Sequence, residues 1–372
     1  MDPYQSAVYP LYQTTTFHLN SLNDMGEYNY TRSGNPTRTI LENKLKELEY
    51  ADYCYSFTTG MAAIDTIFKL LNHGDCIYIN DDIYGGTFRL INNISKKYNI
   101  KVKFQNFTEF NGFGEIIPKI VLIESISNPL LKICDISNIA KICKENNSLL
   151  VVDNSALSPI LCNPLKLGAD IVIHSLSKYI GGHSDTMGGC ILTNNNKIAE
   201  EIKFHQNAQG NALAPFDCWL LLRGIETLEL RIKKQQTNAL KVAKFLKKYF
   251  VKNVYYPGLK NHLNRDIHKM QSFGNGSIIS FETGDLALSE YLVNNCKKFN
   301  ISVSFGSTKS LISLPSKMSH SSIPKENRNF KDDLVRLSIG IEDVNLLIED
   351  LYRTIISYEI KKMNNILKNI NI

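Results

Sequence analysis

Among the residues of this chain, Lys178 has the sequence context that most strongly suggests a catalytic role. It follows a short apolar run, Ile171–Ile173, which predicts a buried strand, and it precedes the glycine pair Gly181-Gly182. An amine at the carboxyl end of a buried strand stands where α/β proteins bind their ligands. Partial removal from water lowers the pKa of such an amine, which can then act as a nucleophile or a base. The alternative interpretation is an ordinary surface lysine in a loop.

Asp153 is a second candidate, because it directly follows the apolar run Leu149–Val152. A carboxylate placed right after a buried strand needs a partner, since an unpaired buried charge is costly. It is either a turn or helix-capping aspartate or the counter-charge of a protonated ligand nitrogen.

A possible anion site comes from Thr58-Thr59-Gly60-Met61, which opens a predicted helix. Free N–H groups and the helix dipole at such an end attract anions. Ser175 and Ser177, which flank the turn before Lys178, could add hydroxyls. Taken alone, this turn could equally be a simple helix cap.

Tyr84 lies beside Gly85-Gly86 between a predicted strand and a predicted helix. Two glycines next to an aromatic residue suggest the close approach of a flat ligand, although an ordinary loop tyrosine is the alternative. Pyridoxal phosphate uses a lysine, a carboxylate for its ring nitrogen, a phosphate cup and a surface for its ring face. The four features together therefore point to this cofactor.

These residues require a scaffold that brings strand ends together. Strands and helices alternate between residues 53 and 207, which indicates βαβ units and a mainly parallel sheet. The expected strands are 76–79, 101–104, 120–124, 148–152 and 171–173, and the expected helices include 35–50, 86–98, 136–146, 197–207 and 226–250.

The pattern changes from about Tyr255 onward. Glycine-punctuated strands are expected at 276–281 and 301–305, with helices at 285–298 and 343–368. We therefore expect an N-terminal arm at 1–50, a large cofactor-binding domain at 51–235 and a smaller α+β domain at 236–372.

Composition excludes several classes of function. The chain has 372 residues, 43% hydrophobic and 21% charged, which is typical of a soluble globular protein. Its net charge of +6 comes from lysines interspersed with acids, so we expect no nucleic-acid partner. No run approaches a membrane span and no signal peptide is visible, so we expect no membrane contact. The eight cysteines form no Cys-x-x-Cys pair, and we expect free thiols and no metal.

Motifs along nearly the whole chain resemble the Cys/Met-metabolism family of pyridoxal-phosphate enzymes, which comprises cystathionine β- and γ-lyases, cystathionine γ-synthases and methionine γ-lyases. Their occurrence in order makes the resemblance specific. The motifs are Asp2–Thr14, Tyr30–Arg38, Asp82–Gly86, Asn128-Pro129, Val152–Asn154, Ser175–Tyr179, Gly182–Asp185, Leu222–Gly224 and Arg336–Asp343.

The resemblance implies a fold-type-I architecture, with a mainly parallel seven-stranded-type sheet, and a role for each matching residue. Lys178 matches the lysine that bonds to the cofactor, Asp153 the partner of the ring nitrogen and Tyr84 the stacking tyrosine. The phosphate cup is matched by Gly60, Met61, Ser175 and Ser177.

Further matches concern the substrate and the neighbouring subunit. Arg336 matches the arginine that binds the substrate α-carboxylate, Ser304 lies in the substrate loop, and Asn128 lies near the ring hydroxyl. Tyr30 and Arg32 match residues that reach the phosphate of a neighbouring subunit. These two matches imply a dimer at least. Because the family is usually a tetramer built from two dimers, we expect a homotetramer, with a dimer as the alternative.

Within the family, segments 206–220 and 303–313 look most like plant-type cystathionine β-lyases. Gamma-lyases and γ-synthases commonly carry an acidic residue where this chain has Val303, and methionine γ-lyases carry a cysteine where it has Gly86. We therefore expect cystathionine β-lyase activity, with cystathionine as the amino-acid substrate. Lys178 would move the proton, with Tyr84 assisting. The alternatives are a γ-lyase or γ-synthase of the same family and, remotely, a cofactor-binding regulator without catalysis.

The chain also departs from the family pattern. The segment that usually precedes Asp2-Pro3 is absent, 106–118 is shorter than usual, and Ile126-Ser127 replaces the more usual Pro-Thr. We expect a cytoplasmic protein, and an organellar targeting peptide upstream stays open.

Overall fold

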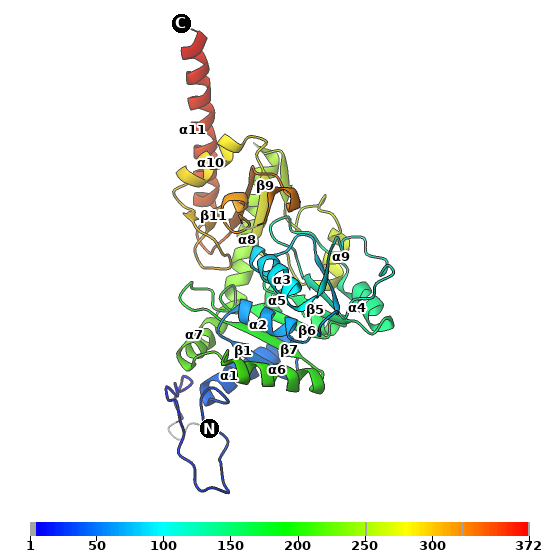
Figure 1. Cartoon of the computed structure of the whole chain (residues 1–372). Coiled ribbons are helices and arrows are strands. Elements are labelled where there is room, and N and C mark those ends of the chain that lie inside the picture. The colour runs from blue at the N-terminus through cyan, green and yellow to red at the C-terminus, as the bar shows by residue number, and fades with distance from the viewer. Residues whose placement is uncertain (1–4, 250, 322, 371–372) are drawn as a thin grey trace.

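The computed structural model describes residues 5–249, 251–321 and 323–370, so Asp2 and Pro3 lie outside the described residues. It contains a seven-stranded and a five-stranded sheet, each with its own helices (Figure 1).

The seven-stranded sheet confirms the expected mainly parallel arrangement. Its strand order is β1-β7-β6-β5-β4-β2-β3. Only β7 runs antiparallel to its neighbours, so the other six strands share one direction. The strands are β1 (Tyr53–Phe57), β2 (Cys76–Asn80), β3 (Lys101–Gln105), β4 (Ile120–Glu124), β5 (Leu149–Asp153), β6 (Ile171–Ser175) and β7 (Gly189–Thr193).

Helices cover both faces of this sheet, which explains why β2 and β4 are buried along their whole length. One face packs against α1 (Pro36–Glu49), α4 (Ile136–Glu145), α5 (Ser158–Leu161) and α7 (Pro215–Ile225). The other packs against α2 (Gly60–Phe68), α3 (Gly85–Tyr98) and α6 (Asn196–Gln209). All eight cysteines are free and buried.

The second sheet has the order β10-β11-β12-β9-β8 and places β12 in its centre. Its strands are β8 (Asn253–Tyr255), β9 (Ile278–Glu282), β10 (Asn300–Ile301), β11 (Leu311–Ser313) and β12 (Leu334–Ser338). The helices of this part are α10 (Leu286–Asn295) and α11 (Val344–Ile370). Helix α9 (Arg265–Gln271) lies beside α4 instead, where Gln271 Nε2 donates to Cys134 O at 3.0 Å and Gln271 Oε1 accepts the Ile136 N–H at 3.1 Å (Figure 1).

Helix α8 (Leu228–Lys248) belongs to both hydrophobic cores. Its first turns place Leu228 and Ile232 in the core of the large sheet, and its later turns place Val242 and Leu246 in the core of the second sheet. The expected domain boundary at 235–236 therefore lies inside a helix.

The prediction of a strand at 301–305 is wrong for all of these residues except the first. Strand β10 ends at Ile301, and both Ser304 and Gly306 have φ of +84°. This left-handed conformation is incompatible with a strand. At Gly306 a Cβ atom would lie 2.7 Å from the backbone nitrogen of Tyr179. The chain thus turns and packs its backbone against the segment that carries Lys178.

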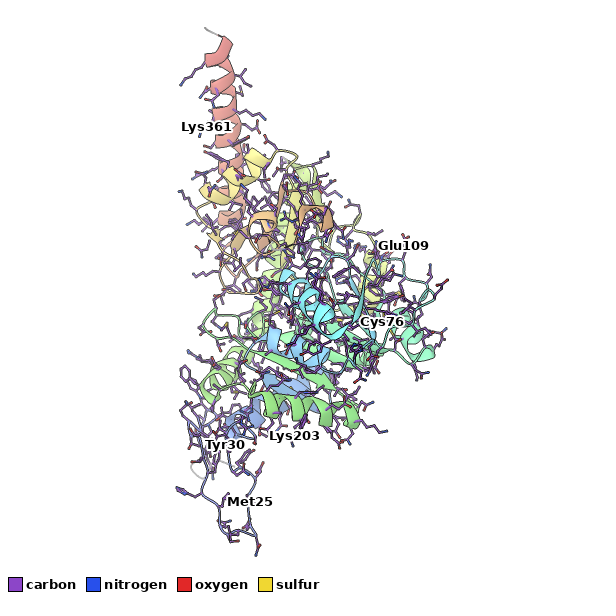
Figure 2. The ribbon with its side chains drawn as sticks, viewed as in Figure 1. Met25, Tyr30, Cys76, Glu109, Lys203 and Lys361 are labelled. Carbon is purple, nitrogen blue, oxygen red and sulfur yellow. The ribbon has the colours of Figure 1, made fainter. Side chains whose placement is uncertain are left out.

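Two segments project from the body (Figure 2). Met25 and Tyr30 lie on the N-terminal segment, which projects at one end, and Lys361 lies on α11, which projects at the other. Helix α1 begins where Asn35 Oδ1 accepts the Thr37 N–H at 3.0 Å and Pro36 occupies the first helical position. Among the described helices, none has the length and apolar character that crossing a bilayer would require.

Candidate active site

A cavity of about 480 Å³ lies at the carboxyl ends of the parallel strands, where loops of the second sheet meet them. Ten of the twelve predicted site residues line it. They are Gly60, Met61, Tyr84, Asn128, Asp153, Ser175, Ser177, Lys178, Ser304 and Arg336.

Lys178 is positioned by a turn that begins where β6 ends. Its N–H donates to Ser175 O at 3.2 Å, and its Nζ reaches into the cavity and donates to Ser304 Oγ at 2.7 Å. Burial, assisted by the positive charge of Arg336, lowers the pKa of Lys178 from 10.5 to about 8. About one tenth of this amine is therefore unprotonated at pH 7, far more than at the ordinary lysine pKa, which favours its action as a base.

Asp153 and Glu124 are two carboxylates at the ends of adjacent strands, paired in register. Asp153 Oδ1 accepts the Ser155 N–H at 2.9 Å, and Glu124 Oε1 accepts the Tyr84 N–H at 2.9 Å. Burial raises the pKa of Asp153, and burial together with the charge of Asp153 raises the pKa of Glu124. A protonated ring nitrogen beside Asp153 would offset the free-energy cost of burying this carboxylate, so Asp153 fits that partner.

The predicted anion site forms where β1 leads into α2. Thr59 Oγ1 caps the helix by accepting the Ala62 N–H at 3.0 Å. The N–H groups of Gly60 and Met61, in the first turn, have no carbonyl behind them in the helix. At Gly60 a Cβ atom would lie 3.2 Å from Ser175 Cβ, so the glycine allows the serine to approach. Unpaired N–H groups beside a hydroxyl fit a phosphate.

Tyr84 immediately precedes α3, and 41% of its surface is exposed. At Gly86 a Cβ atom would lie 2.5 Å from Tyr84 Cε1, so the tyrosine ring rests on the glycine backbone. This contact holds the Tyr84 ring in place, and the ring presents an aromatic surface to the cavity. The close approach of a flat ligand to the two glycines stays a prediction.

Arg336 is a buried cation in the centre of the second sheet, with 2% of its surface exposed. Its Nη1 donates to Asn128 Oδ1 at 2.9 Å and its Nη2 to Ser304 O at 3.1 Å. Burial lowers its pKa to about 10, so it is still cationic at neutral pH. Within the described chain, no salt bridge joins it to a carboxylate. Such a cation fits the carboxylate of an incoming ligand.

Tyr30 and Arg32 do not line this cavity. Arg32 Nη1 donates to Asn207 O at 2.7 Å, and its guanidinium lies 5.6 Å from the centre of the Tyr30 ring. Both residues border a separate exposed hollow near Gly210. Their role toward a neighbouring subunit stays a prediction.

Sequence reasoning missed several residues of the cavity wall. Glu124 follows the apolar run Ile120–Ile123 just as Asp153 follows its own run, so the same signal could have identified it. Thr59, in the predicted turn that opens a helix, and Val303, next to Ser304, line the cavity as well. The remaining lining residues carry no comparable pattern. They are Ile64, Ile126, Ser155, Ala156, Met187, Phe305, Met318 and Ser319.

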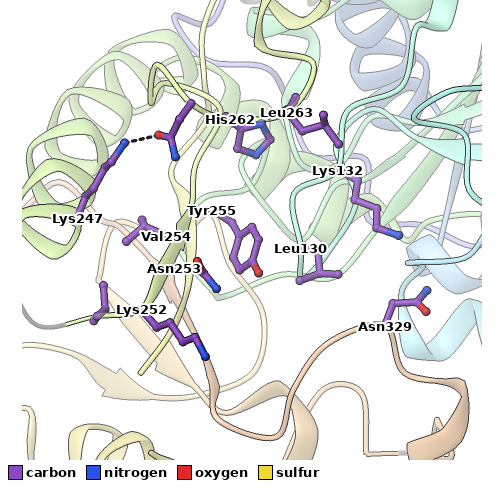
Figure 3. Close-up of a pocket in the computed structure, with 12 residues that line it drawn as sticks. Leu130, Lys132, Lys247, Lys252, Asn253, Val254, Tyr255, His262, Leu263 and Asn329 are labelled. Carbon is purple, nitrogen blue, oxygen red and sulfur yellow. Dashed lines mark hydrogen bonds between the residues drawn. The ribbon is translucent and has the colours of Figure 1, made fainter. Parts of the chain in front are cut away.

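A second hollow of about 450 Å³ contains none of the predicted residues (Figure 3). Leu130, Val254 and Tyr255 contribute to its wall, and Lys247 on its rim is hydrogen-bonded to Asn261. It lacks the combination of amine, carboxylates and helix end found in the first cavity. The chemistry predicted from the sequence therefore belongs to the cavity around Lys178.

Comparison with known proteins agrees with this arrangement. The family model of Cys/Met metabolism PLP-dependent enzymes matches residues 1–355. Cystathionine beta-lyase, chloroplastic, of Mimosa pudica is 49% identical over 94% of this chain and 78% of its own length. Five other relatives with that enzyme name match at 43–48% identity.

Relatives with γ-activities are similar as well. Cystathionine gamma-lyase of Bacillus subtilis is 42% identical over 92% of each chain. The crystal structure of cystathionine gamma synthase from Xanthomonas oryzae pv. oryzae superposes with a TM-score of 0.92 at 36% identity, covering 95% of this chain and 94% of that one.

Proposed function

Since this chain belongs to the Cys/Met metabolism PLP-dependent enzyme family, we propose that it is a cystathionine β-lyase, which splits L-cystathionine into L-homocysteine, pyruvate and ammonia. Its cofactor is pyridoxal 5′-phosphate. The observation that carries the choice among family members is the high identity to relatives named cystathionine β-lyase. Val303 supports it, because this apolar residue lines the cavity where γ-enzymes commonly have an acidic one.

Five residues would hold the cofactor and the substrate. Asp153 would hold the ring nitrogen, and the α2 end at Gly60 with Ser175 would receive the phosphate, since all three line the cavity. Tyr84 would cover the ring face, and Arg336 would bind the substrate α-carboxylate through its N–H groups. When bound, pyridoxal phosphate withdraws electrons from the α-carbon of the amino acid.

Lys178 moves the protons in this proposal. Its amine, with a pKa lowered to about 8, takes the proton from the substrate α-carbon. As the β carbon–sulfur bond breaks, the sulfur keeps the electron pair of that bond and receives a proton from Lys178, with the Tyr84 hydroxyl assisting. Homocysteine leaves, and the remaining three-carbon fragment reacts with water to give pyruvate and ammonia.

The alternative is γ-elimination or γ-replacement, which the matches to a γ-lyase and a γ-synthase keep in view. Incubation of the cofactor-loaded protein with L-cystathionine distinguishes the two eliminations. Pyruvate with homocysteine supports the proposal, whereas 2-oxobutyrate with cysteine assigns the protein to γ-elimination. Bound cofactor without either keto acid would exclude both eliminations and indicate γ-replacement or the non-catalytic regulator.

We also propose that the chain forms a homotetramer of two dimers and acts in the cytoplasm. The exposed arm and the position of Arg32 outside its own cavity support a contribution to a neighbouring subunit. Light scattering during gel filtration measures the assembly, and microscopy of a carboxy-terminal fluorescent fusion tests the compartment. A dimeric mass or an organellar signal would contradict the corresponding part.

A further inference from the structure

His320 is a buried residue that the proposed chemistry does not use. It lies in the connection between β11 and β12 with 1% of its surface exposed. The preceding residues Met318 and Ser319 line the cavity around Lys178. His320 is therefore placed directly behind the cavity wall.

Both ring nitrogens of His320 are engaged. Nε2 lies 2.9 Å from the backbone oxygen of Asn128, and Nδ1 lies 2.8 Å from Ser319 Oγ. Because a carbonyl oxygen can only accept, Nε2 carries the hydrogen and Nδ1 accepts from the Ser319 hydroxyl. Burial and the nearby charge of Arg336 lower the pKa of His320 to about 3, so the ring stays neutral in this tautomer.

Asn128 connects this histidine to the substrate side of the cavity. Its backbone oxygen accepts from His320, and its side-chain Oδ1 accepts from Arg336 Nη1 at 2.9 Å. Arg336 Nη2 in turn donates to the backbone of Ser304, whose hydroxyl accepts from Lys178. A series of hydrogen bonds thus runs from His320 through Asn128 to the guanidinium.

The neutral state of His320 suits this place. A second cation behind Asn128 would repel Arg336, whereas a neutral N–H donor fixes the Asn128 backbone without added charge. Asn128 Oδ1 accepts from Arg336 Nη1 and Ser304 O accepts from Nη2, so a shift of Asn128 would change where the guanidinium points.

We propose that His320 is a positioning residue for the amino-acid substrate, which holds Asn128 and thereby aims Arg336 at the substrate α-carboxylate. Ser319 sets the tautomer that makes this possible. The inference rests on the proposed function only in giving Arg336 an α-carboxylate to bind, which β- and γ-elimination share.

The test compares variants that keep or lose the Nε2 donor. Counted from Cα, the amide nitrogen of glutamine stands in the place of Nε2 and that of asparagine in the place of Nδ1. His320→Asn is expected to raise KM for cystathionine about tenfold, as loss of a hydrogen bond to a charged network would. Its kcat should stay within about threefold of wild type, and its cofactor absorbance should be unchanged. His320→Gln is expected to restore KM to within about threefold of the wild-type value.

A double variant tests whether His320 acts through Arg336. In an Arg336→Ala background, His320→Asn should cause no further rise in KM, because the group it positions is gone. Additive losses in the double variant would overturn the inference, and so would an unchanged KM in His320→Asn. If His320→Asn does not fold, Ser319→Ala replaces it in the test. This variant should raise KM for cystathionine about threefold, and a wild-type KM would contradict the inference.

A binding measurement separates this inference from the proposed function. Holoprotein is titrated with L-alanine, which carries an α-carboxylate, and cofactor absorbance reports the affinity. His320→Asn should weaken alanine binding about tenfold and His320→Gln should not. If wild type breaks no cystathionine, the proposed function fails while this titration still decides the role of His320. Equal alanine affinity in wild type and His320→Asn would refute the inference that His320 positions Arg336.

Discussion

Lys178 Nζ lies 2.7 Å from Ser304 Oγ, so an amine from the end of β6 meets a hydroxyl from a loop of the second sheet. Ser304 also accepts from Arg336 through its backbone oxygen at 3.1 Å. One residue therefore contacts both the base and the cation that binds the substrate carboxylate. The predictions below separate these functions.

Replacement of Lys178 by alanine should reduce turnover of cystathionine at least about 100-fold, because among the described residues no other lysine lines the cavity to carry the proton. Steady-state assay of pyruvate release measures the loss. Lys203→Ala, on the exposed face of α6, is the matched control and should keep wild-type activity. Substantial turnover by Lys178→Ala would contradict its role as the base.

The pKa of Lys178 can be measured directly in cofactor-free protein. An amine reacts with acylating reagents only when unprotonated, so its modification rate should rise with pH and reach half its plateau near pH 8. Peptide mass spectrometry follows the modification at this lysine. Arg336→Gln removes a positive charge that lowers the pKa, so the midpoint should move to higher pH. A midpoint near the ordinary lysine value of 10.5 would show that the amine is not desolvated.

Arg336→Lys keeps the charge but loses the planar pair of N–H groups, so KM for cystathionine should rise at least about tenfold. Cofactor affinity should change little, since the predicted contacts of Arg336 are with the substrate. Arg353→Lys, at an exposed position of α11, serves as the control. An unchanged KM would indicate that another group binds the carboxylate.

Subunit complementation tests the predicted role of Arg32. Arg32→Ala alone should weaken cofactor binding at least about tenfold, through loss of a charged phosphate contact. If Arg32 serves the neighbouring site, a hybrid of Arg32→Ala and Lys178→Ala subunits has one intact site. At a cofactor concentration that leaves Arg32→Ala largely empty, co-expression in equal amounts should then give about one quarter of wild-type activity, more than either parent alone. No recovery in isolated hybrids would place Arg32 in its own subunit's site.

Val303→Glu should shift the products toward γ-elimination. A carboxylate at this exposed position of the cavity wall would bind the distal amino group of cystathionine and change which carbon reacts. The ratio of 2-oxobutyrate to pyruvate should rise at least about threefold. Val303→Gln has a similar shape without the charge and should keep the wild-type ratio, and an equal shift in both variants would rule out the charge as the cause.

Much of the large sheet could be predicted, because buried parallel strands leave apolar runs with polar residues such as Asp153 at their ends. Arg336, Ser304 and Asn128, which line the same cavity, came from the family resemblance and not from such a pattern. The loop around Ser304 could not be predicted, because an alternating apolar pattern favours a strand. Ser304 and Gly306 have positive φ angles, and at Gly306 the chain packs against the backbone of Tyr179, a contact distant in sequence. His320 was missed for the same reason, since its partner Asn128 lies far away in the chain.

Helix α8 has a consequence for how the chain can be divided. Because Ile232 packs in one core and Val242 in the other, a cut at 235–236 would remove a structural support from both halves. Neither half is then expected to persist as an independent fragment after limited proteolysis. The enzyme therefore cannot be assembled from two separately made pieces joined there, and a split version would need its break on either side of the whole helix.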